Sequence, residues 1–122
     1  MRFVVQEHEA RSHHFDFRLE HAGMFASWAV PKGMPMSPGE SRLAIKVADH
    51  ELSFGDFEGE LAEGSYGAGS ISLWDHGSYS PLQWSADEIR VRLDGCRLRG
   101  TYKPKLFTSF ASVAAILACF AV

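Results

Sequence analysis

The stretch Arg11–Glu20 carries the residues whose types and spacing are best suited to chemistry. Its polar and apolar residues alternate, and successive side chains of a β-strand point to opposite faces. The polar face holds His14, Asp16, Arg18 and Glu20, and the opposite, core-facing side holds His13, Phe15, Phe17 and Leu19. Imidazoles and carboxylates are metal ligands, and a guanidinium binds phosphate oxygens. Any half-solvated strand alternates in this way, so the stretch alone leaves a purely structural role open.

Polar residues outside this stretch extend the set. The connection Glu7–Ser12 can fold back between two strands, which would place His8 over His14. The candidate set is His8, His14, Asp16, Arg18 and His50, with Gln6, Lys32 and Arg42 as outer members. Two imidazoles and a carboxylate suit a divalent first-row metal such as manganese, iron or zinc, and an adjacent arginine suits phosphoryl transfer to water.

A second ligand set is compatible with the same residues. His14 and Asp16, joined by the distant His50, form the two-histidine, one-carboxylate pattern of non-haem iron oxygenases. Spacing alone is compatible with both a hydrolase and an oxygenase.

Size and charge limit the classes of protein. A chain of 122 residues with 46% hydrophobic content can bury one modest core, which predicts one domain. The formal charge of -3 argues against a surface that wraps a long nucleic acid, so any nucleic-acid contact is expected to be local. Cys96 and Cys119 form neither a disulfide framework nor a zinc motif, and the N-terminal residues soon turn polar, which predicts a cytoplasmic protein without a secretory signal.

Short alternating segments between glycine-rich turns predict an all-β protein, either a small β barrel of about seven or eight short strands or a sandwich. Gly23 is expected to turn one hairpin, Asp94-Gly95 another, and Asp75–Ser78 a third turn. The predicted strands are Phe3–Gln6, the central stretch, Met24–Val30, Arg42–Ala48, Ser70–Asp75, Glu88–Leu93 and Cys96–Tyr102. In the fourth, Leu43, Ile45 and Val47 are expected on one face and Arg42, Lys46, Ala48 and His50 on the other.

Residues 106–122 differ in kind, because they are uncharged and apolar. As a helix, these 17 residues would span only about 25 Å of a bilayer core of about 30 Å, so we expect a core helix or an unnatural tail and no membrane anchor. The sequence thus divides into a domain over 1–105 and an atypical apolar tail over 106–122.

Several runs of the sequence resemble the 3'-phosphoesterase domain of bacterial DNA ligase D. They are Phe3–His8, His14–Glu20, Ser27–Gly33, Asp56–Gly59 and Glu63–Gly69, in the family's order, and the resemblance covers Phe3–Tyr102. It implies a small β barrel with a manganese-dependent site that removes 3'-terminal ribonucleotides and 3'-phosphates from DNA or RNA/DNA ends during end joining. The implied partners are a DNA ligase or polymerase and an end-binding repair protein.

The resemblance also implies roles for single residues. It makes Arg18 and His50 catalytic residues that hold the scissile phosphate, with water as the nucleophile. The remaining positions divide into metal ligands, which are His8, His14 and Asp16, and substrate-binding residues, which are Gln6, Lys32 and Arg42.

The sequence departs from the family at three places. Phe54 stands where the family has a tyrosine in the active site, and Ala48 where an acidic residue is usual. A phenylalanine cannot hydrogen-bond a phosphate, so a catalytically impaired module that binds DNA ends is the second hypothesis. After Tyr102 the resemblance predicts two more amphipathic strands. The apolar segment in their place suggests truncation or a shifted reading frame, and with it an open barrel edge.

Overall fold

The computed structural model describes residues 1–61, 69–86, 88–106 and 113–119. Within these ranges the chain is all-β, as predicted, with nine strands and one short 3₁₀ helix. The elements are β1 (Arg2–Glu9), β2 (His13–His21), β3 (Met24–Val30), β4 (Ser41–His50), η1 (Leu52–Asp56), β5 (Gly59–Leu61), β6 (Gly69–Trp84), β7 (Ile89–Gly95), β8 (Arg99–Leu106) and β9 (Val113–Cys119). The expected glycine turns of residues 62–68 lie outside the described residues.

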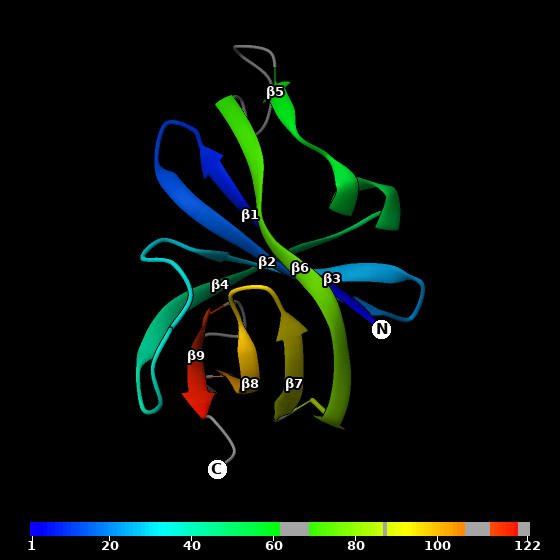
Figure 1. Cartoon of the computed structure of the whole chain (residues 1–122), viewed down its shortest axis with the longest axis vertical. Helices are drawn as coiled ribbons and strands as arrows, with labels where there is room; N and C mark the ends of the chain where they lie inside the picture. The colour runs from blue at the N-terminus through cyan, green and yellow to red at the C-terminus, as the bar shows by residue number, and fades with distance from the viewer. Residues whose placement is uncertain (62–68, 87, 107–112, 120–122) are drawn as a thin grey trace.

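The strands form one antiparallel sheet in the order β1-β2-β3-β4-β9-β8-β7-β6-β5. An additional pairing of β1 with β6 joins the ends of this order, so that eight strands close into a small barrel and β5 pairs outside it. The long strand β6 makes the closure possible, since its first half pairs with β1 and its second half with β7. Figure 1 shows β6 running through both halves of the molecule.

The two faces of β1, β2 and β3 have different environments, as the alternation of β2 predicts. One face buries Phe17, Leu19 and Trp28 in the hydrophobic core. Each fully buried side chain of this size contributes roughly 1.5–3 kcal/mol of hydrophobic free energy, so this face anchors the barrel. The other face carries Asp16 and Arg18 and is free to hold a polar site.

A two-residue turn sets the register of the β2–β3 hairpin. Ala22 and Gly23 have φ angles of 53° and 81°, the left-handed conformations that a tight hairpin turn requires. The turn therefore pairs Arg18 with Ser27, and the prediction of Gly23 as the turn residue is confirmed.

The predicted turn over Asp75–Ser78 is wrong, because these residues lie inside β6. Asp75 pairs with Val5 and Leu73 with Gln6, which makes Trp74 the extra residue of a β-bulge. The turn-like composition has another cause, because Asp75 caps the turn between β7 and β8.

The β7–β8 hairpin is confirmed, but its turn is centred beyond Asp94-Gly95. Asp94 pairs with Arg99, and the Gly95 N–H donates to the Leu98 carbonyl at 2.9 Å. The buried Asp75 carboxylate accepts N–H bonds from Cys96, Arg97 and Leu98, at 2.9, 3.2 and 2.8 Å. A single side chain of β6 therefore organises the whole turn.

We expect the change Asp75→Ala to lower the free energy of unfolding by about 3 kcal/mol, because hydrogen bonds to charged groups contribute about 1.5–3 kcal/mol each and are not additive. Urea denaturation measures the difference. Asp94→Ala, at an exposed position of the same hairpin, is the matched control and should change stability by less than about 0.5 kcal/mol. Equal stability of the two variants would contradict the capping role.

The apolar segment after residue 105 contributes β9, which pairs with β4 on one side and β8 on the other (Figure 1). The expected core helix is therefore wrong for Val113–Cys119, and so is the expected open edge between β4 and β8. β-branched and aliphatic residues favour strands when partners are available on both sides, which the segment's own sequence cannot reveal. The division of the chain at residue 105 stays a prediction. In the described ranges, no helix has the length and apolarity that crossing a membrane requires.

Leu43, Ile45 and Val47 share one face of β4, as predicted, and this face lies away from the core. Leu43 and Ile45 are 49% and 38% exposed, whereas Ala44 is fully buried in the core. Lys46 lies against the core side, with its ammonium group 5.3 Å from the centre of the Trp28 ring.

Candidate metal centre

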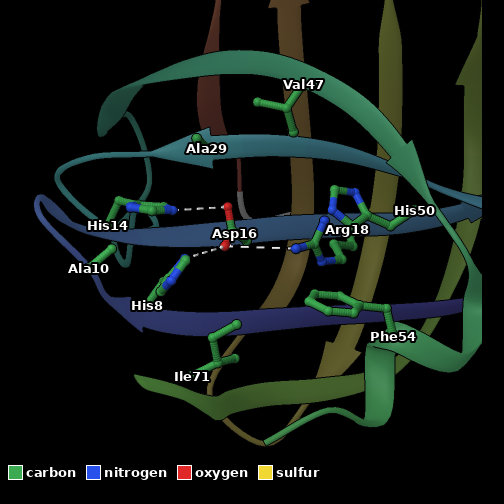
Figure 2. A pocket seen from close by; sticks show the side chains of 10 residues that line it. All are labelled: His8, Ala10, His14, Asp16, Arg18, Ala29, Val47, His50, Phe54 and Ile71. Carbon is green, nitrogen blue, oxygen red and sulfur yellow. Dashed lines mark ion pairs between the residues drawn. The ribbon is translucent and has the colours of Figure 1, made fainter. Parts of the chain in front are cut away.

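A pocket of about 490 Å³ opens on the face of β1–β4 that lies opposite the core. Its polar side chains come from β1, β2 and the end of β4, and η1 supplies one aromatic wall (Figure 2). The polar members are His8, His14, Asp16, Arg18 and His50. The pocket therefore gathers all five inner members of the candidate set that the sequence predicts.

Three side chains of the pocket point their ligand atoms at one another. His8 and His14 are cross-strand partners, with ring centres 4.7 Å apart. The Asp16 carboxylate lies between them, with Oδ2 3.6 Å from His8 Nδ1 and Oδ1 3.3 Å from His14 Nε2 (Figure 2). The predicted placement of His8 over His14 is confirmed.

This donor set fits a divalent first-row metal ion. The three ligand atoms all lie within 4.8 Å of one another, and donors about 2.0–2.2 Å from a shared ion are separated by comparable distances. The His14 Nδ1–H donates to the Ser12 carbonyl at 3.0 Å, which orients Nε2 toward Asp16 as a ligand atom. Two imidazoles and a carboxylate leave further coordination positions for water or substrate.

The charges of the pocket keep Asp16 ionised. Burial raises the pKa of this carboxyl group, but the hydrogen bond with His14 and the charge of Arg18 outweigh burial, so that the pKa lies below its ordinary value. The hydrogen bond with Asp16 also raises the pKa of His14, against the effect of burial. An ionised carboxylate is the form that binds a cation.

Arg18 lies beside the donor set with only 3% of its side chain exposed. Its Nε–H donates to Gln6 Oε1 and its Nη1 group donates to Ser27 Oγ, both at 2.8 Å. Its Nη2 lies 3.7 Å from Asp16 Oδ2. Burial lowers the pKa of Arg18, but a guanidinium stays charged in proteins. The pocket thus holds a fixed positive charge next to the ligand atoms.

Gln6 is fully buried, and the contacts of its amide are made within the protein. Nε2 donates to the Phe54 and Phe57 carbonyls at 2.9 and 3.1 Å, and Oε1 accepts from Arg18. These bonds attach the segment after β4 to the pocket and orient Arg18. The predicted role of Gln6 in binding substrate stays a prediction.

His50 reaches the pocket because of an irregularity in β4. His50 pairs with Phe25 and Val47 with Ser27, so three residues of β4 span two of β3. This extra residue turns His50 to the side of Val47, and its expected placement on the side of Lys46 is wrong.

Burial, followed by the charge of Arg18, lowers the pKa of His50, so the ring is neutral near pH 7. Its Nδ1–H donates to the Ala48 carbonyl at 2.9 Å, which leaves Nε2 as the acceptor.

The iron-oxygenase set of His14, Asp16 and His50 is not the one that the structure brings together. Among the described residues, the buried group with ligand atoms in mutual reach contains His8 in place of His50. An exposed group of Glu7, Glu9 and His13 also meets this distance condition, on the opposite face of the hairpin.

The other predicted substrate-binding residues lie away from this pocket. Lys32 is exposed in the turn after β3. Arg42 pairs with Glu40 at 2.8 Å near the start of β4. Neither lines the pocket, and their roles stay predictions.

Sequence reasoning missed Ser27, although a signal was present. This residue is fully buried and contacts Arg18 directly. The two-residue turn at Ala22-Gly23 fixes the pairing of Arg18 with Ser27, so the length of the turn was sufficient to predict the contact.

The fold and the pocket together define a small β-barrel domain with a buried group of possible metal ligands beside an arginine. Comparison with known proteins gives the family. Residues 6–105 match the DNA Ligase D 3'-phosphoesterase domain, and the chain belongs to this family. Membership implies phosphoesterase chemistry.

Two relatives show the extent of the similarity. The chain is 45% identical over 104 residues to the multifunctional non-homologous end joining protein LigD of Mycobacterium bovis, which covers 82% of the chain and 14% of that protein. It is 43% identical over 107 residues to the protein of the same name from Pseudomonas aeruginosa, covering 84% of the chain and 13% of that protein. The chain therefore spans about one seventh of the length of these relatives.

Proposed function

We propose that this chain is a manganese-dependent 3'-phosphoesterase that removes 3'-terminal ribonucleotides or 3'-phosphates from DNA or RNA/DNA ends. The observation that carries the proposal is the meeting of His8, His14 and Asp16 beside the buried Arg18. Another divalent first-row metal would fit the same ligands, since nitrogen and oxygen donors discriminate weakly among these ions.

Each residue of the pocket has a part in the proposed reaction. His8, His14 and Asp16 would hold the metal ion, which when bound supplies Lewis-acid polarisation of a phosphate oxygen. The Nη2 group of Arg18 neutralises the charge that grows on the phosphate in the transition state. Water is the nucleophile, and His50 Nε2 is placed to accept its proton; once protonated, Nε2 donates a hydrogen bond to the phosphate or the leaving oxygen.

The relatives support a place in DNA repair by end joining, because both are non-homologous end joining proteins by name. We propose that the chain acts on DNA ends in the cytoplasm, together with a DNA ligase or polymerase and an end-binding repair protein. The formal charge of -3 agrees with a local contact at a strand terminus.

A 3'-labelled primer-template that ends in a single ribonucleotide tests this function, alongside the same duplex with a 3'-phosphate. We expect the terminal group to be released when Mn²⁺ is present and to stay on the DNA when a chelator removes the metal. A purified protein that binds no divalent metal would contradict the proposal. Intact substrate in the presence of bound Mn²⁺ would exclude the enzyme and leave the binding module.

The second candidate, a module that binds DNA ends without turnover, is favoured by Phe54. The ring of Phe54 lies 5.0 Å from the Arg18 guanidinium carbon and 5.1 Å from the His50 ring centre, and it offers no hydrogen bond at this position. Ala48, at a position where the family has an acid, adds no charge.

We expect Phe54→Tyr to raise the turnover number on the 3'-ribonucleotide substrate by up to about 100-fold, because one well-placed donor to a developing oxyanion is worth about 10²–10³ in rate. Phe57→Tyr, in the ring stacked on Phe54, is the matched control and should leave turnover unchanged. Equal rates for Phe54→Tyr and the wild type would show that the missing hydroxyl does not limit the chemistry.

A further inference from the structure

Arg18 and Asp16 are neighbours on one face of β2, yet they do not form a close ion pair. The distance from Arg18 Nη2 to Asp16 Oδ2 is 3.7 Å, whereas charged N–H···O⁻ bonds measure about 2.7–2.9 Å. Both side chains are buried, and low dielectric strengthens their attraction. Another interaction must therefore hold the guanidinium away from the carboxylate.

Two neutral acceptors supply that interaction, and each has a fixed polarity. The Ser27 hydroxyl donates to the Phe25 carbonyl at 2.9 Å, so its lone pairs are turned toward Arg18 Nη1. The Gln6 amide donates through Nε2 to two backbone carbonyls, so Oε1 must face Arg18 Nε. Neither acceptor can reverse its hydrogen bond without leaving a buried group unpaired.

The remaining donors of Arg18 face the pocket. A guanidinium has five N–H groups, and in the described part of the chain Gln6 and Ser27 each take one of them. The Nη2 group is the part closest to Asp16 and to the ligand atoms around it. Because the two hydrogen-bond partners, Gln6 and Ser27, are neutral, they leave the positive charge of Arg18 available for an anion.

We propose that Ser27 is a positioning residue which, together with Gln6, tethers Arg18 away from Asp16. The tether leaves the Asp16 carboxylate oxygens available to a cation and the Arg18 Nη2 group available to a phosphate oxygen. The inference rests on the proposed function for the identity of these ligands, and it adds a residue that the family resemblance did not supply. Without the hydroxyl, Arg18 would close onto Asp16 and compete with the metal ion.

A calorimetric titration with Mn²⁺ alone, without any DNA substrate, tests the tether. We expect Ser27→Ala to weaken Mn²⁺ binding by roughly 10-fold, the lower end of the loss when an outer partner of a metal site is removed. Ser27→Thr, which keeps the hydroxyl, should restore binding, and Ser80→Ala, an exposed serine of β6, should match the wild type. The ¹⁵N resonance of Arg18 Nε should shift in Ser27→Ala and stay in place in Ser80→Ala.

Thermal unfolding of each variant separates loss of the tether from loss of the fold. If Ser27→Ala is unfolded, Ser27→Cys is used. Its thiol is somewhat larger than the hydroxyl and is a weaker acceptor, so this variant should weaken Mn²⁺ binding partially. Wild-type Mn²⁺ affinity in a folded Ser27→Ala protein overturns the tether and leaves the proposed function standing. A wild type that binds Mn²⁺ with the expected dependence on Ser27 but releases no 3'-terminal group overturns the function alone.

Discussion

Asp16→Asn is expected to abolish Mn²⁺-dependent release of the 3'-terminal ribonucleotide and to weaken Mn²⁺ binding by about 100-fold or more. The change keeps the shape of the side chain and removes its charge. The carboxylate is the one acid in the buried group of ligand atoms, with His8 and His14 as its partners. Loss of an outer partner already costs about 10–100-fold in metal affinity, so loss of a direct ligand should cost at least as much. Calorimetry and the labelled-primer assay measure the two effects.

The exposed group of Glu7, Glu9 and His13 provides a matched control, because it offers the same kinds of ligand atoms on the other face of the hairpin. Glu7→Gln removes one carboxylate from it, at a position 2.8 Å from His13 Nε2. We expect this variant to bind Mn²⁺ and cleave the primer as the wild type does. If Glu7→Gln loses Mn²⁺ binding and Asp16→Asn keeps it, the metal centre has been assigned to the wrong face.

The sequence predicted the faces of β2 and the meeting of His8 with His14, because both follow from local rules. A period of two assigns Asp16 and Phe17 to opposite faces, and a short connection makes β1 and β2 antiparallel partners. The two-residue turn at Gly23 then determines which residues of β2 and β3 are paired. These rules depend only on residues that are close in the sequence, so strand faces and hairpin pairing can be predicted from one sequence.

The features that a single sequence could not reveal depend on contacts between distant segments. The extra residue of β4 that turns His50 toward the pocket breaks the period of two without a glycine or proline to mark it. The residues around Asp75 predict a turn at this position, although its carboxylate caps the turn over residues 96–98. Strand β9 forms between β4 and β8, and the apolar sequence of Val113–Cys119 specifies neither partner.

Arg18→Lys is expected to lower the turnover number at saturating Mn²⁺ by about 10²–10³-fold, the usual cost of removing a group that stabilises an oxyanion. It should also weaken Mn²⁺ binding, because an untethered ammonium group can approach Asp16. A lysine ammonium has no planar fork, so it cannot donate to Gln6 and Ser27 and still present two N–H groups to a phosphate. Burial would also lower the pKa of a lysine at this position, because only the neighbouring carboxylate opposes desolvation. Single-turnover rates at saturating Mn²⁺ isolate the chemical step from metal binding.

Arg90→Lys, at a half-buried position of β7 away from the pocket, is the matched control and should retain the wild-type rate. Turnover of Arg18→Lys within about threefold of that control would mean that a single positive charge is sufficient and that the fork geometry contributes little to catalysis.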